Sequence, residues 1–358
     1  MTTVASSADY VPFHERQGWQ DLVPIAQLDA PNCLVPIAYS QQYRDAMDTF
    51  RAIINVNEKS NRTLEVTEAL IKLNPGHYSI WAYRAQTLLA MNANLEHELD
   101  LMDKLVKAHI KSYQVWQHRK TIVTALQSSQ RELSFSNRAL SFDPKNYHTW
   151  AYRQWVLCHF FSDLKITKQQ QEEPVATTST AKQDFKDRER VWQQELDYVE
   201  ELLQSDIRNN SAWNHRFFVC FESGQAGASS VVTPREIHYV KGKLAISPNN
   251  PSAWNYLKGV LERTQTPMST LLPFVECLAL GTPESMPKEE PQVSRLAELP
   301  AYLAIEFIAD ATAQQAKQQD SKDKAQEASA LFTSLCQFDP IRSRYWQYKA
   351  TEALSIVV

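Results

Sequence analysis

The sequence predicts an all-α fold made of repeated helical hairpins, and two recurring residues support this prediction. The first is a tryptophan in similar surroundings, at Trp81, Trp116, Trp150, Trp213, Trp254 and Trp346. The first three copies lie roughly 34 residues apart, a period typical of arrays of two-helix repeats. In such an array equivalent positions of successive units line up on one surface, so the repeat also indicates where a functional surface can form.

The second recurring residue is a glutamate 18 positions before four of these tryptophans, followed each time by an apolar residue. The pairs are Glu98-Leu99, Glu132-Leu133, Glu195-Leu196 and Glu236-Ile237. Each pair opens a run with apolar residues at helical spacing. The pair is not kept in the first and last units. The first unit has Thr63-Leu64 at this position, and the last has Glu327, which is one residue out of register. We therefore expect a first helix beginning near the glutamate and a second helix carrying the tryptophan.

Proline marks the turn between the two helices of several units. In four units this proline follows asparagine, aspartate or serine, which are residues that often cap helices. The pairs are Asn74-Pro75, Asp143-Pro144, Ser247-Pro248 and Asp339-Pro340. Because proline suits the first position of a helix, these pairs predict an N-cap followed by the start of the second helix.

Three segments depart from the repeat within what we expect to be a single helical-repeat domain, 1–358. Residues 1–51 form an N-terminal segment with aromatic anchors and no repeat. Residues 168–190 form a polar insert between the third and fourth units, predicted to be a flexible or helical excursion because it has too few apolar residues to fold alone. The proline-rich stretch 264–300 is expected to be an irregular connection with short helices.

Composition excludes several classes of function. Only 7 of 358 residues are glycine, and no glycine-rich phosphate-binding loop occurs. A formal net charge of −4 gives no overall attraction to nucleic acid or anionic membranes. The five cysteines include no C-x-x-C pair, which argues against a disulfide framework or a zinc site in this chain. No apolar run approaches the length of a membrane span, so we expect a cytoplasmic protein.

The position three before tryptophan is tyrosine in the first three units only. These residues are Tyr78, Tyr113 and Tyr147, and the later units have other residues there. A purely structural requirement would persist along the array, so the loss indicates a local surface with its own role. The alternative is that the tyrosines pack on the next helix. The tryptophans, and the arginines three residues after them, are predicted to be structural, packing neighbouring units together.

Cations stand five residues before tryptophan in three consecutive units, at Lys111, Lys145 and Arg208. We place them in the first turn of the second helix, where the helix dipole disfavours positive charge. A lysine there becomes useful when an anion binds to the helix N-terminus, and this pattern predicts a phosphate site. The alternative is a solvated lysine. Gln114 and His148, two before tryptophan, either bind a ligand or cap their helices.

The motif Tyr-x-x-Trp-x-x-Arg, present in the first three units, resembles the repeat of protein prenyltransferase α subunits. The resemblance extends to Pro36-Ile37-Ala38-Tyr39 near the N-terminus and to Asn209–Arg216 and Ser252–Gly259 in later units. Within the family the chain is most similar to the α subunit shared by protein farnesyltransferase and geranylgeranyltransferase type I. The alternatives are the α subunit of Rab geranylgeranyltransferase and a non-enzymatic tetratricopeptide-like scaffold.

The resemblance implies a crescent-shaped α–α superhelix that wraps around a separate β subunit and is active only in that heterodimer. It implies transfer of a farnesyl or geranylgeranyl group from its diphosphate to the cysteine thiol of proteins that end in a CaaX box, such as small GTPases. Zinc held by the β subunit, and magnesium, are the implied cofactors. No metal ligands are expected in this chain.

The resemblance also assigns candidate site residues. It implies that Lys111 contacts the isoprenoid diphosphate and that Gln114 reaches the C-terminal carboxylate of the peptide. The remaining candidates for substrate binding are Tyr78, Tyr113, Asn146, Tyr147 and His148. Ser112 departs from the family pattern, which more commonly has asparagine before this tyrosine.

Overall fold

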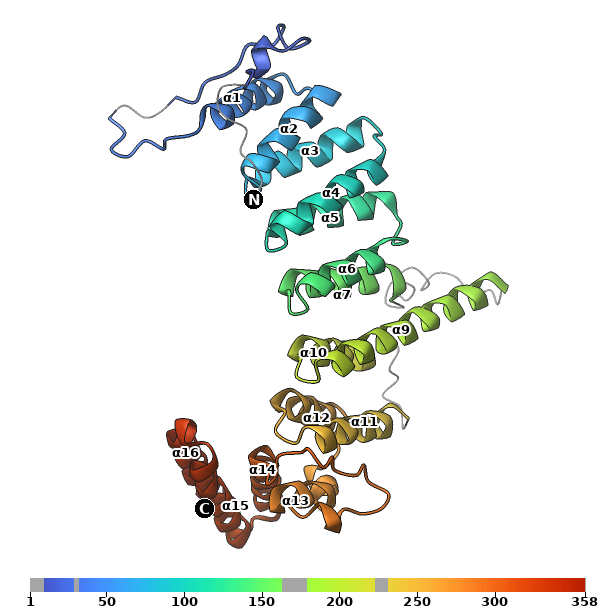
Figure 1. Cartoon of the computed structure of the whole chain (residues 1–358), viewed down its shortest axis with the longest axis vertical. Coiled ribbons are helices and arrows are strands. Elements are labelled where there is room, and N and C mark those ends of the chain that lie inside the picture. The colour runs from blue at the N-terminus through green and yellow to red at the C-terminus, as the bar shows by residue number, and fades with distance from the viewer. Residues whose placement is uncertain (1–9, 29–31, 163–178, 223–230, 358) are drawn as a thin grey trace. The chain divides into compact units, whose positions relative to one another are not determined.

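The computed structural model describes residues 10–28, 32–162, 179–222 and 231–357, and side chains in the first turns of the insert helix are described from Lys186 onward. These residues form helices joined by turns and loops, and they include no β-strand. The chain divides into two compact units, Met1–Val156 and Leu157–Val358. Each unit is described by itself (Figure 1). The predicted all-α array of helical hairpins is confirmed.

The first unit begins with a short 3-10 helix that packs beside a longer helix, and hairpins follow. Its elements are η2 (Phe13–Glu15), α1 (Gln41–Asn55), α2 (Asn61–Leu73), α3 (Tyr78–Ala90), α4 (Leu95–His109), α5 (Tyr113–Leu126), α6 (Glu132–Phe142) and the start of α7 (Tyr147–Phe161). The hairpins are α2/α3, α4/α5 and α6/α7 (Figure 1). As predicted, each second helix carries its tryptophan in the first turn.

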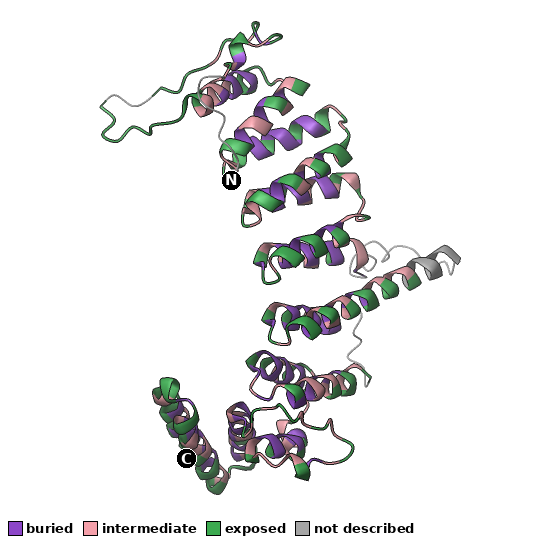
Figure 2. Cartoon of the chain, in the orientation of Figure 1, coloured by how far each residue is buried: buried purple, intermediate pink, exposed green. Residues whose placement is uncertain are grey.

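The second unit continues with hairpins and has an irregular connection before the last of them. Its elements are α9 (Ser179–Ser205), α10 (Asn210–Phe217), η4 (Phe218–Glu222), α11 (Val232–Ile246), α12 (Pro251–Arg263), η5 (Met268–Leu271), α13 (Leu272–Leu280), η6 (Pro283–Ser285), α14 (Tyr302–Gln319), α15 (Lys322–Phe338), η7 (Pro340–Arg342) and α16 (Ser343–Leu354). Of the polar insert, 168–178 lie outside the described residues, and 179–190 form the first turns of α9. Buried residues gather where paired helices face each other (Figure 2).

The prediction that X-Pro pairs open the second helix was wrong for three of the four pairs, because Asn74, Asp143 and Ser247 are instead the C-caps of the first helices. Asp339 is both the C-cap of α15 and the N-cap of η7, the 3-10 helix that Pro340 opens before α16, so the prediction holds there. A residue before proline is disfavoured in the α conformation, so the chain leaves the helix at this point. The Asn74 and Asp143 side chains then accept hydrogen bonds from the backbone N–H groups of Gly76 and Lys145, at 3.2 and 3.4 Å. In the first and third hairpins the second helix therefore begins four residues after the capping residue.

Each repeat tryptophan fastens the turn that precedes its helix. In five repeats the indole Nε1–H donates to the carbonyl oxygen six residues earlier, at 2.7 to 2.9 Å; the acceptors are Pro75, Ile110, Pro144, Ile207 and Pro248. Trp346 instead donates to the Asp339 carboxylate at 3.2 Å. All six indoles are buried, so the predicted structural role of the tryptophans holds.

The recurring glutamates and arginines meet across neighbouring hairpins. Arg84 of α3 donates through Nε and Nη2 to the carboxylate of Glu98 on α4, at 2.8 and 2.7 Å. His118 of α5 hydrogen-bonds the same carboxylate at 2.8 Å. The arrangement repeats at Glu132, which pairs with Arg119 at 2.7 and 2.9 Å and accepts from Tyr152. At Glu98 and at Glu132 a buried carboxylate thus joins a hairpin to the preceding one.

The same geometry recurs in the second unit. Glu236 of α11 pairs with Arg216 of α10 at 2.7 and 3.1 Å and accepts a hydrogen bond from Tyr256 of α12 at 2.7 Å. All of these side chains are buried. Because a buried charge is costly unless it is paired and hydrogen-bonded, this set holds adjacent hairpins in one register.

We predict that Glu98→Gln lowers the free energy of unfolding by about 3–5 kcal/mol at pH 7, because it leaves the buried Arg84 guanidinium without its counter-charge. Urea denaturation followed by circular dichroism measures the change. The matched control is Glu68→Gln, which removes the exposed ion pair with Lys72 and should cost about 0–1 kcal/mol. Equal losses in both variants would contradict the proposed importance of the buried pair.

We also predict that Glu98 makes part of the free energy of unfolding sensitive to acid. Burial alone raises the pKa of Glu98, but hydrogen bonds from His118 and Arg84 outweigh it and lower the pKa from 4.5 to about 2. Because the folded pKa lies below the unfolded one, this stabilisation is present above pH 4.5 and is lost as the pH falls towards 2. The unfolding free energy of Glu98→Gln should therefore fall less steeply over this range than that of the wild-type protein.

Candidate functional site

A row of exposed tyrosines marks one end of the hairpins in the first unit. Tyr78, Tyr113 and Tyr147 are the first residues of α3, α5 and α7, and their exposed fractions are 75%, 68% and 70%. The alternative, that these tyrosines pack on the next helix, holds in part for Tyr113, whose ring meets His148 of α7 at a centroid distance of 4.4 Å. All three rings nevertheless stay largely exposed. We call the set of Tyr78, Lys111, Tyr113, Gln114, Asn146, Tyr147 and His148 the ridge.

Lys111 lies just outside helix α5 rather than in its first turn, which corrects its predicted position. Ser112 is the N-cap of α5, and its side chain does not cap the helix. Lys111 is exposed and forms no ion pair with any residue that the structure describes. Lys111 therefore directly precedes a helix end whose first N–H groups have no side-chain cap, a combination suited to an anion.

Gln114 is held by groups from two different repeats. The Ser112 hydroxyl donates to its Oε1 at 3.1 Å, and its Nε2 donates to the Gly76 carbonyl oxygen in the turn between α2 and α3, also at 3.1 Å. These two contacts fix which way the amide points and leave one N–H of Nε2 able to donate to a ligand. The sequence did not predict that Ser112 and Gly76 orient Gln114. The Gly76 contact joins two different repeats, and no local pattern around either residue indicates a contact with Gln114.

Asn146 differs from the other ridge residues because it is buried. Its Oδ1 accepts from the backbone N–H and the hydroxyl of Thr149 at 2.9 and 3.1 Å, and its Nδ2 donates to Asp143 at 3.2 Å. Asn146 therefore caps α7. Its role in substrate binding stays a prediction; the cap itself holds the start of α7, where Tyr147 and His148 follow.

His148 connects the aromatic side chains of two hairpins. Its ring meets that of Tyr113 edge to face at a centroid distance of 4.4 Å and that of Tyr147 at 5.5 Å. Partial burial lowers the pKa of His148 below its ordinary value of 6.5. The neutral imidazole, with one donor and one acceptor nitrogen, is therefore the form present at neutral pH.

The ridge borders an apolar groove between α3 and α5. The groove holds about 530 Å³, and its lining includes Tyr78, Tyr113 and Gln114 at one end and Ala82, Ala85 and Leu89 further along α3. The small side chains of Ala82 and Ala85, one and four residues after Trp81, leave this space open. An extended apolar segment could lie in the groove with a polar end at Gln114.

The described ranges contain no group of three or more histidine, cysteine, aspartate or glutamate side chains arranged to hold a metal ion. In the same ranges no helix is long and apolar enough to cross a membrane. The ridge as described offers cationic, amide, phenol and imidazole groups for binding. It does not include a nucleophile paired with a base.

Comparison with known proteins identifies the repeat. The family described as protein prenyltransferase alpha subunit repeat matches residues 60–91, 95–126, 129–160, 192–223 and 233–264. Protein farnesyltransferase/geranylgeranyltransferase type-1 subunit alpha of Dictyostelium discoideum is 31% identical over 350 residues, which cover 98% of this chain and 96% of that protein. The subunit of the same name from Pisum sativum is 32% identical over 343 residues, which cover 95% of each.

A solved structure gives the same result. The chain described as Candida albicans protein geranylgeranyltransferase-I complexed with GGPP matches with a TM-score of 0.70 at 28% sequence identity. The match covers 97% of this chain and 99% of that one. The resemblance inferred from Tyr-x-x-Trp-x-x-Arg is therefore confirmed along nearly the whole chain.

We predict that the pKa of His148, measured by NMR titration, lies below 6.5 because the surrounding aromatic rings desolvate the charged form. Tyr113→Ala, which opens one side of the imidazole to water, should move that pKa back towards 6.5. An unchanged His148 pKa in Tyr113→Ala would show that the contact with Tyr113 does not cause the shift.

Proposed function

This chain belongs to the protein prenyltransferase α-subunit family, and from that premise we propose that it forms a heterodimer with a β subunit that transfers a farnesyl or geranylgeranyl group to CaaX-ending proteins. The relatives that match nearly its whole length are named as α subunits of farnesyltransferase and geranylgeranyltransferase type 1. This favours the shared α subunit over the Rab-specific one and over a non-enzymatic scaffold.

The observation that carries the proposal is Lys111 beside the uncapped N-terminus of α5. In prenyl transfer a cysteine thiolate attacks C1 of the isoprenoid, the bond from C1 to the diphosphate oxygen breaks, and diphosphate leaves with the bonding electrons. Negative charge therefore grows on the leaving oxygens in the transition state. The ammonium of Lys111 and the oriented N–H groups of the helix end can stabilise that charge.

The ridge also suits the peptide substrate. The free N–H of Gln114 can donate to a C-terminal carboxylate, and the apolar groove beside it can accept the aliphatic residues of a CaaX box. Tyr78, Tyr113, Tyr147 and His148 then flank the bound groups. The proposed substrates are small GTPases and other proteins with this C-terminal sequence.

The cofactors belong to the proposed heterodimer and not to ligands in this chain. We propose that zinc, held by the β subunit, lowers the pKa of the substrate thiol, and that magnesium accompanies the diphosphate. This chain contributes binding, orientation and charge stabilisation.

We predict that Lys111→Ala, assayed with a β subunit on a CaaX peptide, slows turnover by about 2–4 kcal/mol in activation free energy, as expected for losing one donor to a developing oxyanion. Heterodimer affinity should be unchanged, because Lys111 makes no structural contact. The matched control is Arg208→Ala, which removes the cation at the equivalent position of the fourth repeat and should retain turnover. Equal losses of assembly and turnover in Lys111→Ala would instead assign this lysine a structural role.

We predict that Ser112→Ala raises the KM for a CaaX peptide and leaves kcat nearly unchanged, because the amide of Gln114 loses one of its two orienting contacts. Gln114→Ala should raise KM further. A peptide with a C-terminal amide in place of the carboxylate should bind wild-type and Gln114→Ala enzymes equally. A selective loss of kcat in Ser112→Ala would contradict the positioning role.

A further inference from the structure

The turn between α2 and α3 links Gln114 to helix α1, which precedes the repeats. The Gly76 carbonyl oxygen, which accepts from Gln114 Nε2 at 3.1 Å, belongs to this turn. Asn74 Oδ1 accepts from the backbone N–H of Gly76 at 3.2 Å. Asn74 Nδ2 donates to the hydroxyl oxygen of Tyr43 on α1 at 3.3 Å. A chain of hydrogen bonds therefore runs from α1 through the turn to the amide of Gln114.

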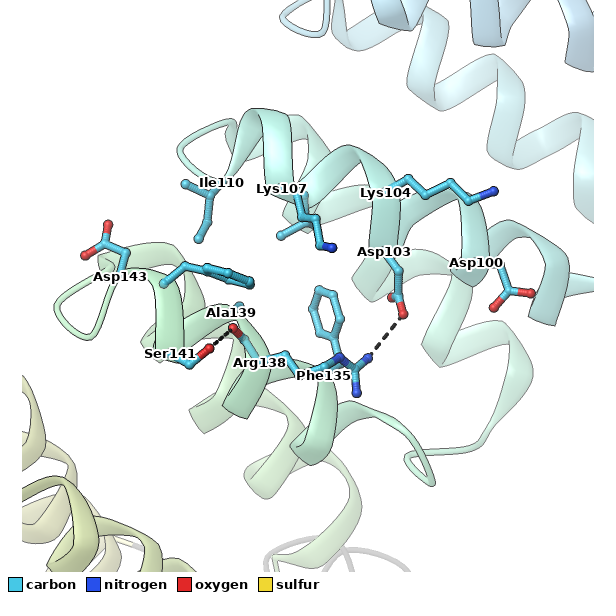
Figure 3. Close-up of a pocket in the computed structure, with 12 residues that line it drawn as sticks. Asp100, Asp103, Lys104, Lys107, Ile110, Phe135, Arg138, Ala139, Ser141 and Asp143 are labelled. Carbon is cyan, nitrogen blue, oxygen red and sulfur yellow. Dashed lines mark hydrogen bonds and ion pairs between the residues drawn. The ribbon is translucent and has the colours of Figure 1, made fainter. Parts of the chain in front are cut away.

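The third hairpin shows why asparagine matters in this chain of bonds. Asp143, at the end of α6 (Figure 3), accepts from the Lys145 backbone N–H at 3.4 Å and from Asn146 Nδ2 at 3.2 Å. An ionised aspartate only accepts hydrogen bonds, whereas an asparagine accepts through its oxygen and donates through its nitrogen. Asn74 can therefore hold the turn with one atom and donate to Tyr43 with the other.

Two further hydrogen bonds hold the turn in shape. The indole Nε1–H of Trp81 donates to the Pro75 carbonyl oxygen at 2.8 Å, and the His77 backbone N–H donates to the Asn74 carbonyl oxygen at 3.3 Å. These bonds tie the shape of the turn to Asn74. The Gly76 carbonyl oxygen therefore stands where Asn74 holds it. A donor that bonds this oxygen must point towards it, because hydrogen bonds weaken steeply as their angle departs from linear.

Tyr43 is itself held in place at the start of α1. Ser40 caps this helix by accepting from the Tyr43 backbone N–H at 3.2 Å, and the Tyr43 ring lies beside that of Tyr39 at a centroid distance of 5.3 Å. Among the residues that the structure describes, Asn74 is the only hydrogen-bond partner of the Tyr43 hydroxyl. The hydroxyl therefore gives Asn74 a fixed acceptor, and its removal leaves the packing of the ring intact.

We infer that Tyr43 and Asn74 are positioning residues for recognition of the C-terminal carboxylate of the peptide, because they hold the Gly76 carbonyl oxygen that orients the Gln114 amide. This inference rests on the proposed function, since it takes a CaaX peptide as the ligand of Gln114. It goes beyond that function by assigning a part in peptide recognition to α1, a helix outside the repeats. Ser112 holds the Oε1 side of the amide, and the chain from α1 holds the Nε2 side.

The test uses the heterodimer and two CaaX peptides, one with a free C-terminal carboxylate and one with a C-terminal amide. Tyr43→Phe removes only the hydroxyl. It should raise the KM for the carboxylate peptide about two- to tenfold, as expected for one lost hydrogen bond, and leave kcat nearly unchanged. The KM for the amide peptide should not change. The matched control is Tyr39→Phe, at the neighbouring ring, which should leave both KM values as in the wild type.

A double-mutant cycle tests whether Tyr43 acts through Gln114. When Gln114 is replaced by alanine, Tyr43→Phe should have no further effect on KM, because no amide remains to be oriented. Asn74→Ala removes both side-chain bonds of Asn74 and should raise the KM for the carboxylate peptide at least as much as Tyr43→Phe. Circular dichroism checks that each variant is folded, and Tyr43→Phe keeps the inference testable if Asn74→Ala unfolds.

The outcomes separate this inference from the proposed function. A KM rise confined to the carboxylate peptide, and absent when Gln114 is alanine, supports the inference. Wild-type KM values in Tyr43→Phe and Asn74→Ala overturn it and leave the proposed function intact. Equal KM rises for both peptides, or independent effects of Tyr43→Phe and Gln114→Ala, also overturn it, because they assign Tyr43 a general structural role. Absence of transfer by the wild-type heterodimer overturns the proposed function and the inference together.

Discussion

The buried carboxylate at the start of the first helix is the interaction on which successive hairpins depend. Glu98 and Glu132 each receive an arginine from the preceding hairpin and a histidine or tyrosine from their own. Burying such a carboxylate without a counter-charge would cost free energy. Burying its arginine partner without the carboxylate would also be costly. The hairpins therefore stack in a single register that satisfies all three groups. Glu236 repeats the arrangement in the second unit.

This register places the ridge residues at one end of the hairpins. Because the arginine and the tryptophan belong to the same helix, fixing the arginine against the next glutamate also fixes the indole, and the indole holds the preceding turn by one hydrogen bond. The residues five, three and two positions before tryptophan are thereby presented at the same end of successive hairpins. A catalytic surface gains from such rigidity, since groups that are already oriented need not reorganise during reaction.

Two neighbouring turns of similar sequence have different roles for a local reason. At α7 the buried Asn146 caps the helix, so its first N–H groups are partly satisfied within the protein. At α5 the Ser112 hydroxyl turns to Gln114 instead, and the helix end stays open beside Lys111. The replacement of asparagine by serine at this position therefore changes more than one hydrogen bond. The serine hydroxyl orients Gln114 instead of capping the helix, and the first N–H groups of α5 remain available to bind an anion.

The sequence by itself determined the period, the pairing of helices, the family and the candidate residues of the ridge. These follow from local patterns, because helical periodicity and the Tyr-x-x-Trp-x-x-Arg motif are contained within one repeat. Only the tertiary structure decided that the recurring glutamate pairs with the arginine of the preceding repeat, that Asn146 is buried, that Lys111 lies outside its helix, and that an apolar groove opens between α3 and α5. Exposure and hydrogen-bond partners are set by neighbours tens of residues away, and a single repeat does not encode them.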